Sequence, residues 1–493
     1  MKTFLFYDVE TSGLNPAFDQ ILTFACIRTD LSLTEISREL ITIQLRRDIV
    51  PSPHAFITHC LTIDELKHGI TEYQAAQQIH KLFNTPGTIS FGYNSLGFDD
   101  EFLRFLFYRN LLDPYSHQYA NQCSRMDMLP VTALFRVFCD HVMNWPHLED
   151  GRSSLKLERI SDENQFTTSG RAHEAMNDVE AVIELARIFS REKDIWAYAL
   201  DFFNKTKDVL RINALKKEIR VGNKPFRICL MVSASFGPKN NYLAPVLHVG
   251  ESLPYKNQSL WLRLDREGVF KKNEESGIYD LFVIRKRPAD ELIVLPYLDR
   301  FIRKLPLASQ QTSRENLEKI QSDPDLFFKT IQYHLEYKYP VIPDMDPDAA
   351  LYQSGFFSSS EKKEISKFHG TKNSEKPIVC ESFTSIRVKT LARRILSRNF
   401  EDLFPIHSNS EYVDHLRRLA SSIPGSNGQG NQGDQIKGFR NDMKYISGQG
   451  LVHIKEIEKQ EKKLPQLTRI QKDILSWLKI YIENLFVSGV EAP

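Results

Sequence analysis

The residues of this sequence best suited to chemistry are carboxylates in three separate stretches. Asp8 and Glu10 alternate at the end of an apolar run, so both side chains leave the same face of a short strand. Two like charges held so close repel each other, and a shared proton, a basic neighbour or a divalent metal would neutralise them. The pair alone is equally compatible with the solvated side of an edge strand.

The other two stretches lie far along the chain. Asp99 follows an extended apolar segment and a glycine-containing turn that begins at Asn94. His173 and Asp178 are five residues apart, which in a continuous helix corresponds to about 140° of rotation. We therefore expect His173 at or before the start of a helix, leaning into the same space as Asp178.

Four carboxylates of this kind suit a pair of hard divalent cations, which prefer oxygen ligands. Two such ions can activate a water molecule and stabilise the leaving oxygen of an in-line phosphoryl displacement. A neutral histidine beside them could take the proton of that water, because its ordinary pKa of about 6.5 is close to neutral pH. The chemistry indicated is phosphodiester hydrolysis. The metal ligands would be Asp8, Glu10, Asp178 and, directly or through water, Asp99, with His173 as general base.

Together, the three stretches resemble the motifs of the DEDDh exonuclease superfamily. They read D-x-E at Asp8 and Glu10, N-x-x-x-F-D ending at Asp99, and H-x4-D at His173 and Asp178. Within that superfamily the chain is similar to the bacterial exonuclease I family over nearly its whole length. The further segments that carry this likeness are 92–94, 107–110, 113–115, 144–146, 351–357 and 398–400.

The resemblance implies a Mg²⁺-dependent exodeoxyribonuclease that degrades single-stranded DNA from the 3′ end to 5′-mononucleotides, in DNA repair or recombination. It implies two Mg²⁺ ions per site, with Mn²⁺ as a substitute. It also implies a protein partner, the acidic C-terminal tail of single-stranded DNA-binding protein, docking on a basic surface. We expect the enzyme to act as a monomer.

The resemblance also carries substrate contacts over to Glu10, Arg104, Lys156, Tyr115 and Tyr119. Arg104 and Lys156 are expected on phosphates, although Lys156 stands where the family has an arginine and so lacks the two-pronged guanidinium geometry. The two tyrosines offer ring faces on which bases can stack. Tyr119 stands where the family has a tryptophan.

Two other interpretations stay open at this stage. The chain could be a 3′–5′ exoribonuclease of the same superfamily, because nothing in the three motifs senses a 2′-hydroxyl group. It could also be a non-catalytic single-strand-binding scaffold. A scaffold of this kind would have lost at least one ligand, whereas all five motif residues are present.

Composition sets wider limits. A chain of 493 residues predicts about three domains, and its net charge of +1 gives no overall attraction for a polyanion. Any nucleic-acid surface must therefore come from local charge, such as the Lys- and Arg-rich stretch 204–227. Six scattered cysteines without a C-x-x-C pair indicate reduced thiols, and no apolar run approaches the ~20 residues of a membrane span. We expect a cytoplasmic protein with no membrane contact.

The elements that must position the motifs follow from periodicity. Residues 1–194 alternate apolar and helical segments, which predicts an α/β exonuclease domain with a central mixed sheet, ribonuclease H-like by resemblance. A strand meander is expected over 4–10, 20–29 and 39–45, and helices over 71–83, 99–110 and 172–189.

The remainder divides into two further domains. Residues 195–346 contain short β-like segments that by resemblance form an SH3-like β-barrel, with Trp261 in its core and Phe236 exposed to a base. Residues 347–493 read as the helical C-terminal domain of the family. Two stretches of that domain, 358–377 and the Gly/Asn/Gln-rich insertion near 421–449, lack a core-forming pattern and are expected to be less ordered.

Overall fold

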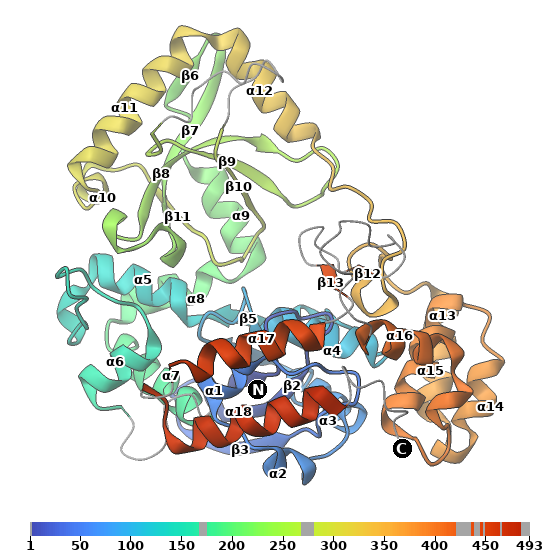
Figure 1. The fold of residues 1–493 in the computed structure, drawn as a ribbon. Helices are drawn as coiled ribbons and strands as arrows, with labels where there is room; N and C mark the ends of the chain where they lie inside the picture. Colours follow the sequence, from blue (N-terminus) through green and yellow to red (C-terminus); the bar gives the residue numbers. More distant parts are fainter. Residues whose placement is uncertain are drawn as a thin grey trace.

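The computed structural model describes most of the chain (Figure 1). His173, predicted to lie at or before the start of a helix, is outside the described residues. The described ranges are 2–166, 175–267, 281–420, 435–437, 444–446, 449–463 and 466–484.

A mixed five-stranded sheet in the order β3-β2-β1-β4-β5 forms the centre of the N-terminal region. Strands β1, β2 and β3 are an antiparallel meander, and β4 and β5 run parallel to β1. The predicted α/β class and mixed sheet are confirmed, although β3 begins before the expected residue 39. The strands are β1 Thr3–Thr11, β2 Ile21–Thr29, β3 Glu35–Thr42, β4 Thr88–Gly92 and β5 Ser124–Asp127.

The side chains of β1 alternate between two cores. Phe4 and Phe6 pack into a core shared with α5 and α7, whereas Leu5, Tyr7 and Val9 pack into a second core with α3 and α4 on the opposite face. By this alternation, Asp8 and Glu10 continue the face of Phe4 and Phe6, on which α7 lies. The helices of this region are α1 Pro53–His59, α2 Ile63–Lys67, α3 Glu72–Phe83, α4 Asp99–Arg109, α5 Met128–Phe138, α6 Leu157–Asn164, α7 Ala175–Phe189 and α8 Lys193–Phe202.

The middle region is an antiparallel sheet in the order β10-β9-β8-β7-β11, with β6 paired to β7. Helices α11 and α12 share a core with this sheet, and Figure 1 shows the pair spanning its outer side. Sequence analysis did not foresee these helices or β11, and the SH3-like class stays a prediction. The elements are α9 Lys205–Ala214, β6 Ile219–Val221, β7 Lys224–Val232, β8 Leu243–Glu251, β9 Ser259–Arg263, β10 Val283–Lys286, β11 Ile293–Pro296, α10 Asp299–Ile302, α11 Leu307–Ser322 and α12 Pro324–Glu336.

Two aromatic residues of the middle region are predicted to have opposite environments. Trp261 is fully buried, as predicted. The prediction that Phe236 is exposed is wrong, because its ring is buried and the Arg263 guanidinium lies over it at 4.5 Å. A cation from a neighbouring strand therefore covers the face that was expected to meet a base.

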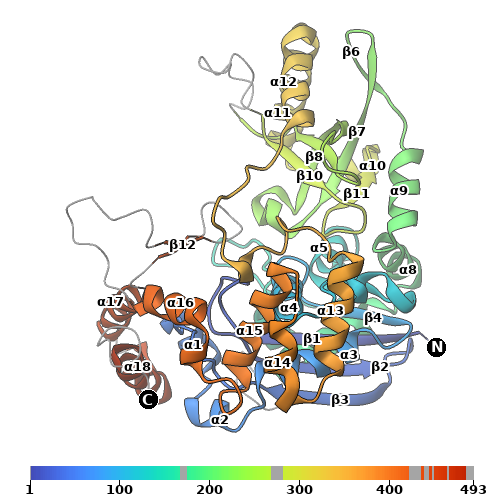
Figure 2. The same cartoon turned by 90° about the vertical axis from the view of Figure 1, so that its right-hand side faces the viewer.

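The C-terminal region is built from helices, and Figures 1 and 2 show α17 and α18 beside α1 of the N-terminal region. Residues 358–377, expected to be less ordered, instead contain α13, whose start is fixed by a reciprocal cap between Ser358 and Glu361. Within the predicted insertion, β12 and β13 pair in antiparallel fashion. The elements are α13 Ser359–Gly370, α14 Lys376–Glu381, α15 Ile386–Asn399, α16 Ser410–Ala420, β12 Gln435–Lys437, β13 Lys444–Ile446, α17 Gln449–Glu461 and α18 Arg469–Ile482.

Packing crosses both predicted domain boundaries. Helix α8 runs through the first boundary, at 194/195. One apolar core joins Val131 of α5 to Leu230 of the middle region, across the first boundary. The ion pair between Asp346 and Arg394, at 2.6 Å, crosses the second. The boundaries stay predictions, and the three regions form one continuous packed body. None of the described helices is both long and apolar enough to cross a bilayer.

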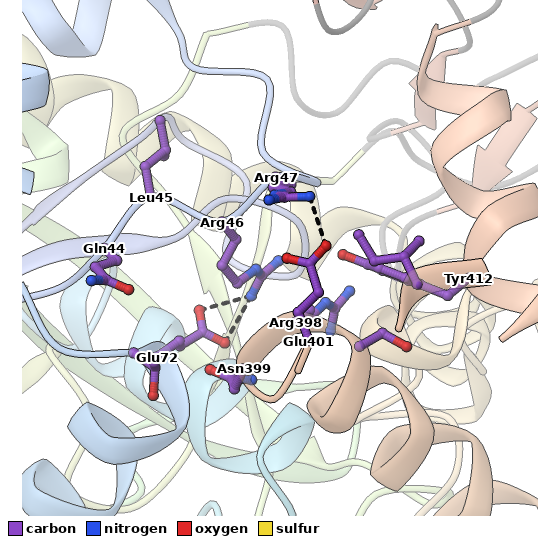
Figure 3. Close-up of a pocket in the computed structure, with 12 residues that line it drawn as sticks. Gln44, Leu45, Arg46, Arg47, Glu72, Arg398, Asn399, Glu401 and Tyr412 are labelled. Carbon is purple, nitrogen blue, oxygen red and sulfur yellow. Dashed lines mark hydrogen bonds and ion pairs between the residues drawn. The ribbon is translucent and has the colours of Figure 1, made fainter. Parts of the chain in front are cut away.

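The N- and C-terminal regions also meet through buried ion pairs, which we call the seam network. Arg46 pairs with Glu72 at 2.7 Å and Asp48 at 2.8 Å, and the cavity of about 230 Å³ beside them is lined by Arg398 and Tyr412 of the C-terminal region (Figure 3). Arg398 in turn pairs with Asp48 at 2.7 Å. The network consists of Arg46, Asp48, Glu72, Arg109, Asp346, Asp348, Arg394 and Arg398.

Candidate metal centre

Three of the predicted carboxylates converge. Asp8 and Glu10 lie near the end of β1, and Asp178 lies in the first turn of α7, which packs against that strand. One carboxylate oxygen from each of the three residues lies within 4.8 Å of the others. The fold therefore brings together acids that are about 170 positions apart in sequence.

Asp99 is the fourth predicted ligand. It is the first residue of α4, directly after the turn that leaves β4, and its side chain is buried. Burial, with the nearby negative charge of Asp127, raises its pKa to about 8. The negative charge of Asp99 also raises the pKa of Asp8, which places the two carboxylates in one electrostatic environment.

The pKa values of Asp8 and Glu10 are shifted in the same direction as that of Asp99. Burial is the main cause for Asp8, whose pKa lies well above its ordinary value, with further contributions from Asp99 and Asp178. Burial together with the charges of Asp178 and Asp99 raises the pKa of Glu10 to about 8. The neighbours that act on these groups are other carboxylates. An anionic donor set made only of oxygen fits a hard divalent cation, which would bring the missing positive charge.

Lys156 shares a cavity with the metal centre. The cavity, of about 570 Å³, is lined by Asp178, Lys156 and Tyr242 of the middle region. The Tyr242 hydroxyl donates to the carbonyl of Ser153 at 2.5 Å, so the middle region holds the segment that carries Lys156. The exposed Lys156 side chain is thus near the position expected for a substrate phosphate.

The predicted stacking tyrosines lie together in a second cavity of about 350 Å³. Tyr119 is 62% exposed, whereas Tyr115 is half-buried against Phe356. Lys362 of α13 also lines this cavity. The cavity therefore combines aromatic surfaces with one cation.

Arg104 is placed differently from the free cation expected on a phosphate. Its buried guanidinium pairs with Asp100 at 2.6 Å and Glu101 at 2.5 Å, and it lies 5.7 Å from the centre of the Tyr115 ring. The contact between Arg104 and substrate stays a prediction. In the structure, Arg104 connects α4 to the ring of Tyr115, which lines the aromatic cavity.

Sequence analysis missed two acidic residues around Asp99. Asp100 is buried and accepts contacts from Arg104, Arg125 and His117, so that its pKa falls well below the ordinary value although burial alone would raise it. Asp127 ends β5 and binds the turn before Asp99. Asp100 could have been noticed because it adjoins the motif residue Asp99. Asp127 could have been noticed because an acid immediately before an apolar helix is a common capping residue.

Comparison with known proteins agrees with this geometry. Residues 5–186 match the RNase T exonuclease family model. Exodeoxyribonuclease I of Escherichia coli (strain K12) is 28% identical over 443 residues, covering 85% of this chain and 90% of that protein. The enzyme of the same name from Buchnera aphidicola subsp. Schizaphis graminum is 29% identical over 446 residues, covering 85% and 88%.

A solved structure shows the same fold. Escherichia coli exonuclease I in complex with a dA16 oligonucleotide superposes with a TM-score of 0.78 at 23% identity, covering 98% of this chain and 100% of that one. The match to the exonuclease family model identifies residues 5–186 as an exonuclease domain, and the carboxylates that β1 and α7 bring together lie within it. More narrowly, the chain is similar to exodeoxyribonuclease I enzymes over about 85% of its length.

Proposed function

We propose that the protein is a Mg²⁺-dependent exodeoxyribonuclease that releases 5′-mononucleotides from the 3′ end of single-stranded DNA. The observation that carries the proposal is the convergence of Asp8, Glu10 and Asp178 within 4.8 Å. The match of residues 5–186 to the exonuclease family model supports exonuclease activity. Solved relatives described as complexes with dA16 and dT13 oligonucleotides support single-stranded DNA as the substrate.

Asp8, Glu10 and Asp178 would hold two Mg²⁺ ions, with Asp99 binding directly or through water, and Mn²⁺ would be accepted in their place. When bound, such ions supply Lewis acidity toward the scissile phosphate and lower the pKa of a coordinated water. Asp99 orients this donor set from the rigid start of α4. His173 serves as general base and holds the proton taken from the attacking water.

The chain's other contributions are to binding. Lys156 neutralises a backbone phosphate in the cavity it shares with Asp178, and Glu10 contacts the terminal nucleotide. Tyr119 and Tyr115 stack on bases further along the strand, where Arg104 supports the ring of Tyr115. A single strand can unstack its bases onto such rings, whereas a duplex keeps them paired.

The wider setting follows from the same proposal. The enzyme would act as a monomer in DNA repair or recombination, with the acidic tail of single-stranded DNA-binding protein docking on a basic surface. Its six cysteines are all free thiols, which suits the reducing cytoplasm. We also propose the three-domain division at 1–194, 195–346 and 347–493, with an SH3-like second domain.

The test is digestion of matched DNA and RNA oligonucleotides, each labelled at the 3′ or the 5′ end, with and without Mg²⁺. We expect immediate release of the 3′ label from DNA as a mononucleotide, only with metal. Faster digestion of RNA would make the enzyme an exoribonuclease, and binding without digestion would make it a scaffold.

His173→Ala should lower kcat far more than DNA affinity, and an unchanged rate would refute the role of His173 as the general base.

A further inference from the structure

Asp127 makes an unusual set of contacts for a residue outside the metal centre. It ends β5, and its fully buried carboxylate accepts three backbone N–H groups. One oxygen accepts from Leu129 at 2.9 Å, which caps α5, and also from Asn94 at 2.8 Å. The other oxygen accepts from Leu96 at 3.0 Å. One side chain thus serves a helix start and a turn that is more than 30 positions away.

The turn held by Asp127 is the one that delivers Asp99. It leaves β4 after Gly92 and ends at the first residue of α4. Asn94 has a φ of 61°, a left-handed conformation that costs free energy for a residue other than glycine. Such a conformation persists only where its surroundings hold it, and here the acceptor for the Asn94 N–H is Asp127.

The turn has little freedom to adopt another conformation. A Cβ atom added at Gly92 would lie 2.5 Å from the Cβ of Ser95, so the two ends of the turn are closely packed. The Ser95 carbonyl accepts from the Asp100 N–H at 2.8 Å, which joins the turn to the start of α4. Because this bond links the turn to Asp100, a displaced turn would also move the neighbouring residue, Asp99.

We propose that Asp127 is a positioning residue for the metal centre, one that fixes the Asn94–Leu96 turn and through it the carboxylate of Asp99. This role rests on the proposed metal-dependent function. It differs from ordinary helix capping, because only the Leu129 bond belongs to the cap. Residues that orient a ligand from outside the coordination sphere typically affect metal affinity about 10–100-fold.

Two substitutions separate the roles of Asp127. Asp127→Asn keeps the shape but turns one acceptor oxygen into an NH₂ donor that faces a backbone N–H. Asp127→Ser retains a helix cap for α5 but is too short to reach the turn as well. Asp323→Asn is the matched control, since Asp323 caps α12 by accepting from the Leu326 N–H and lies outside the metal centre.

The measurements are Mn²⁺ binding by calorimetry without DNA, the melting temperature, and kcat and KM on single-stranded DNA. We expect both Asp127 variants to bind Mn²⁺ about tenfold or more weakly and to lose kcat with little change in KM. Asp323→Asn should keep wild-type Mn²⁺ affinity even where its melting temperature falls.

Either folded Asp127 variant with wild-type Mn²⁺ affinity would overturn the positioning role and leave Asp127 as a structural cap. A wild-type protein that binds no Mn²⁺ and releases no nucleotide would instead refute the proposed function. The two failures are therefore distinguishable.

Discussion

Two clusters of acids in this molecule have opposite electrostatic character. In the metal centre, burial and neighbouring carboxylates raise the pKa of Glu10 and of Asp99 to about 8. In the seam network, burial would also raise the pKa of Glu72, but the guanidinium groups of Arg109 and Arg46 lower it to about 2. The pKa of a carboxyl group is thus shifted in opposite directions by its neighbours in the two clusters.

The two clusters differ in whether cations of the protein balance their negative charge. The seam network brings its own cations, so its charge is balanced inside the protein and it joins the N- and C-terminal regions. For Asp8 and Glu10 the charges that shift the pKa are other carboxylates, so we expect an ion from solution to balance them. A site of this kind trades stability for function if it binds metal as proposed.

The largest expected effect comes from removing one metal ligand. Asp8→Asn keeps the size of the side chain but removes a charge from the donor set. Since bound metal supplies several kcal/mol of transition-state stabilisation, we expect kcat on single-stranded DNA to fall about a thousandfold or more. Glu401→Gln, which changes an exposed acid elsewhere, is the control and should keep wild-type activity. An Asp8→Asn enzyme that retained a tenth of wild-type activity would contradict the assignment of Asp8 as a metal ligand.

The next effect comes from unbalancing the seam network. Arg398 is 2% exposed and pairs with Asp48 at 2.7 Å and Asp348 at 2.5 Å. Arg398→Met would leave both acids buried without this cation, and we expect a loss of about 3–5 kcal/mol in urea unfolding. The half-exposed pair between Arg47 and Glu401 at the same seam is the control, since Arg47→Met should cost at most about 1 kcal/mol. Equal losses in the two variants would mean that burial does not distinguish these pairs.

Acid should weaken the seam network selectively. The pKa of Glu72 is about 2 in the folded protein against an ordinary 4.5, so its contribution is complete above the ordinary value and is lost as pH falls toward 2. The pKa of Asp48 is also depressed, by Arg398 and Arg46 acting against burial. Urea midpoints measured from pH 6 down to pH 3 should fall steadily. The fall should be shallower in Arg46→Met, and identical slopes would refute the assignment.

The smallest expected effect has the opposite sign. In metal-free protein, Asp8→Asn removes repulsion among buried carboxylates, so we expect it to stabilise the fold by about 0.5–2 kcal/mol. The comparison is made by urea unfolding in a chelator at pH 8. A metal-free variant less stable than wild type would show that Asp8 has a favourable partner in the fold.

Sequence patterns were sufficient for the acids of the metal centre and for the sheet that carries two of them. The alternation of Asp8 and Glu10 along an apolar strand defines a face, and the order of the three motifs defines the chemistry. Local signals also existed for what was missed in the C-terminal region, because the Ser358–Glu361 spacing is that of a capping box.

Other features depend on contacts that no local pattern contains. Phe236 lies in a short turn and is buried in the apolar core of the middle region with Arg263 of β9 over its ring, and the contacts of Asp127 with the Asn94–Leu96 turn form only when β5 lies beside β4. The balance of the seam network likewise arises from residues more than 300 positions apart. Such pairings arise from tertiary packing. The sequence alone therefore predicts the acids but not the residues that contact them.

The most direct test of the comparison is the melting temperature of wild type and Asp8→Asn, each in chelator and in excess Mg²⁺. The account predicts that Mg²⁺ raises the melting temperature of wild type substantially and that of Asp8→Asn little or not at all, because only wild type holds the complete donor set. An equal Mg²⁺-induced rise in both proteins, or none in wild type, would contradict the claim that these carboxylates form a metal centre.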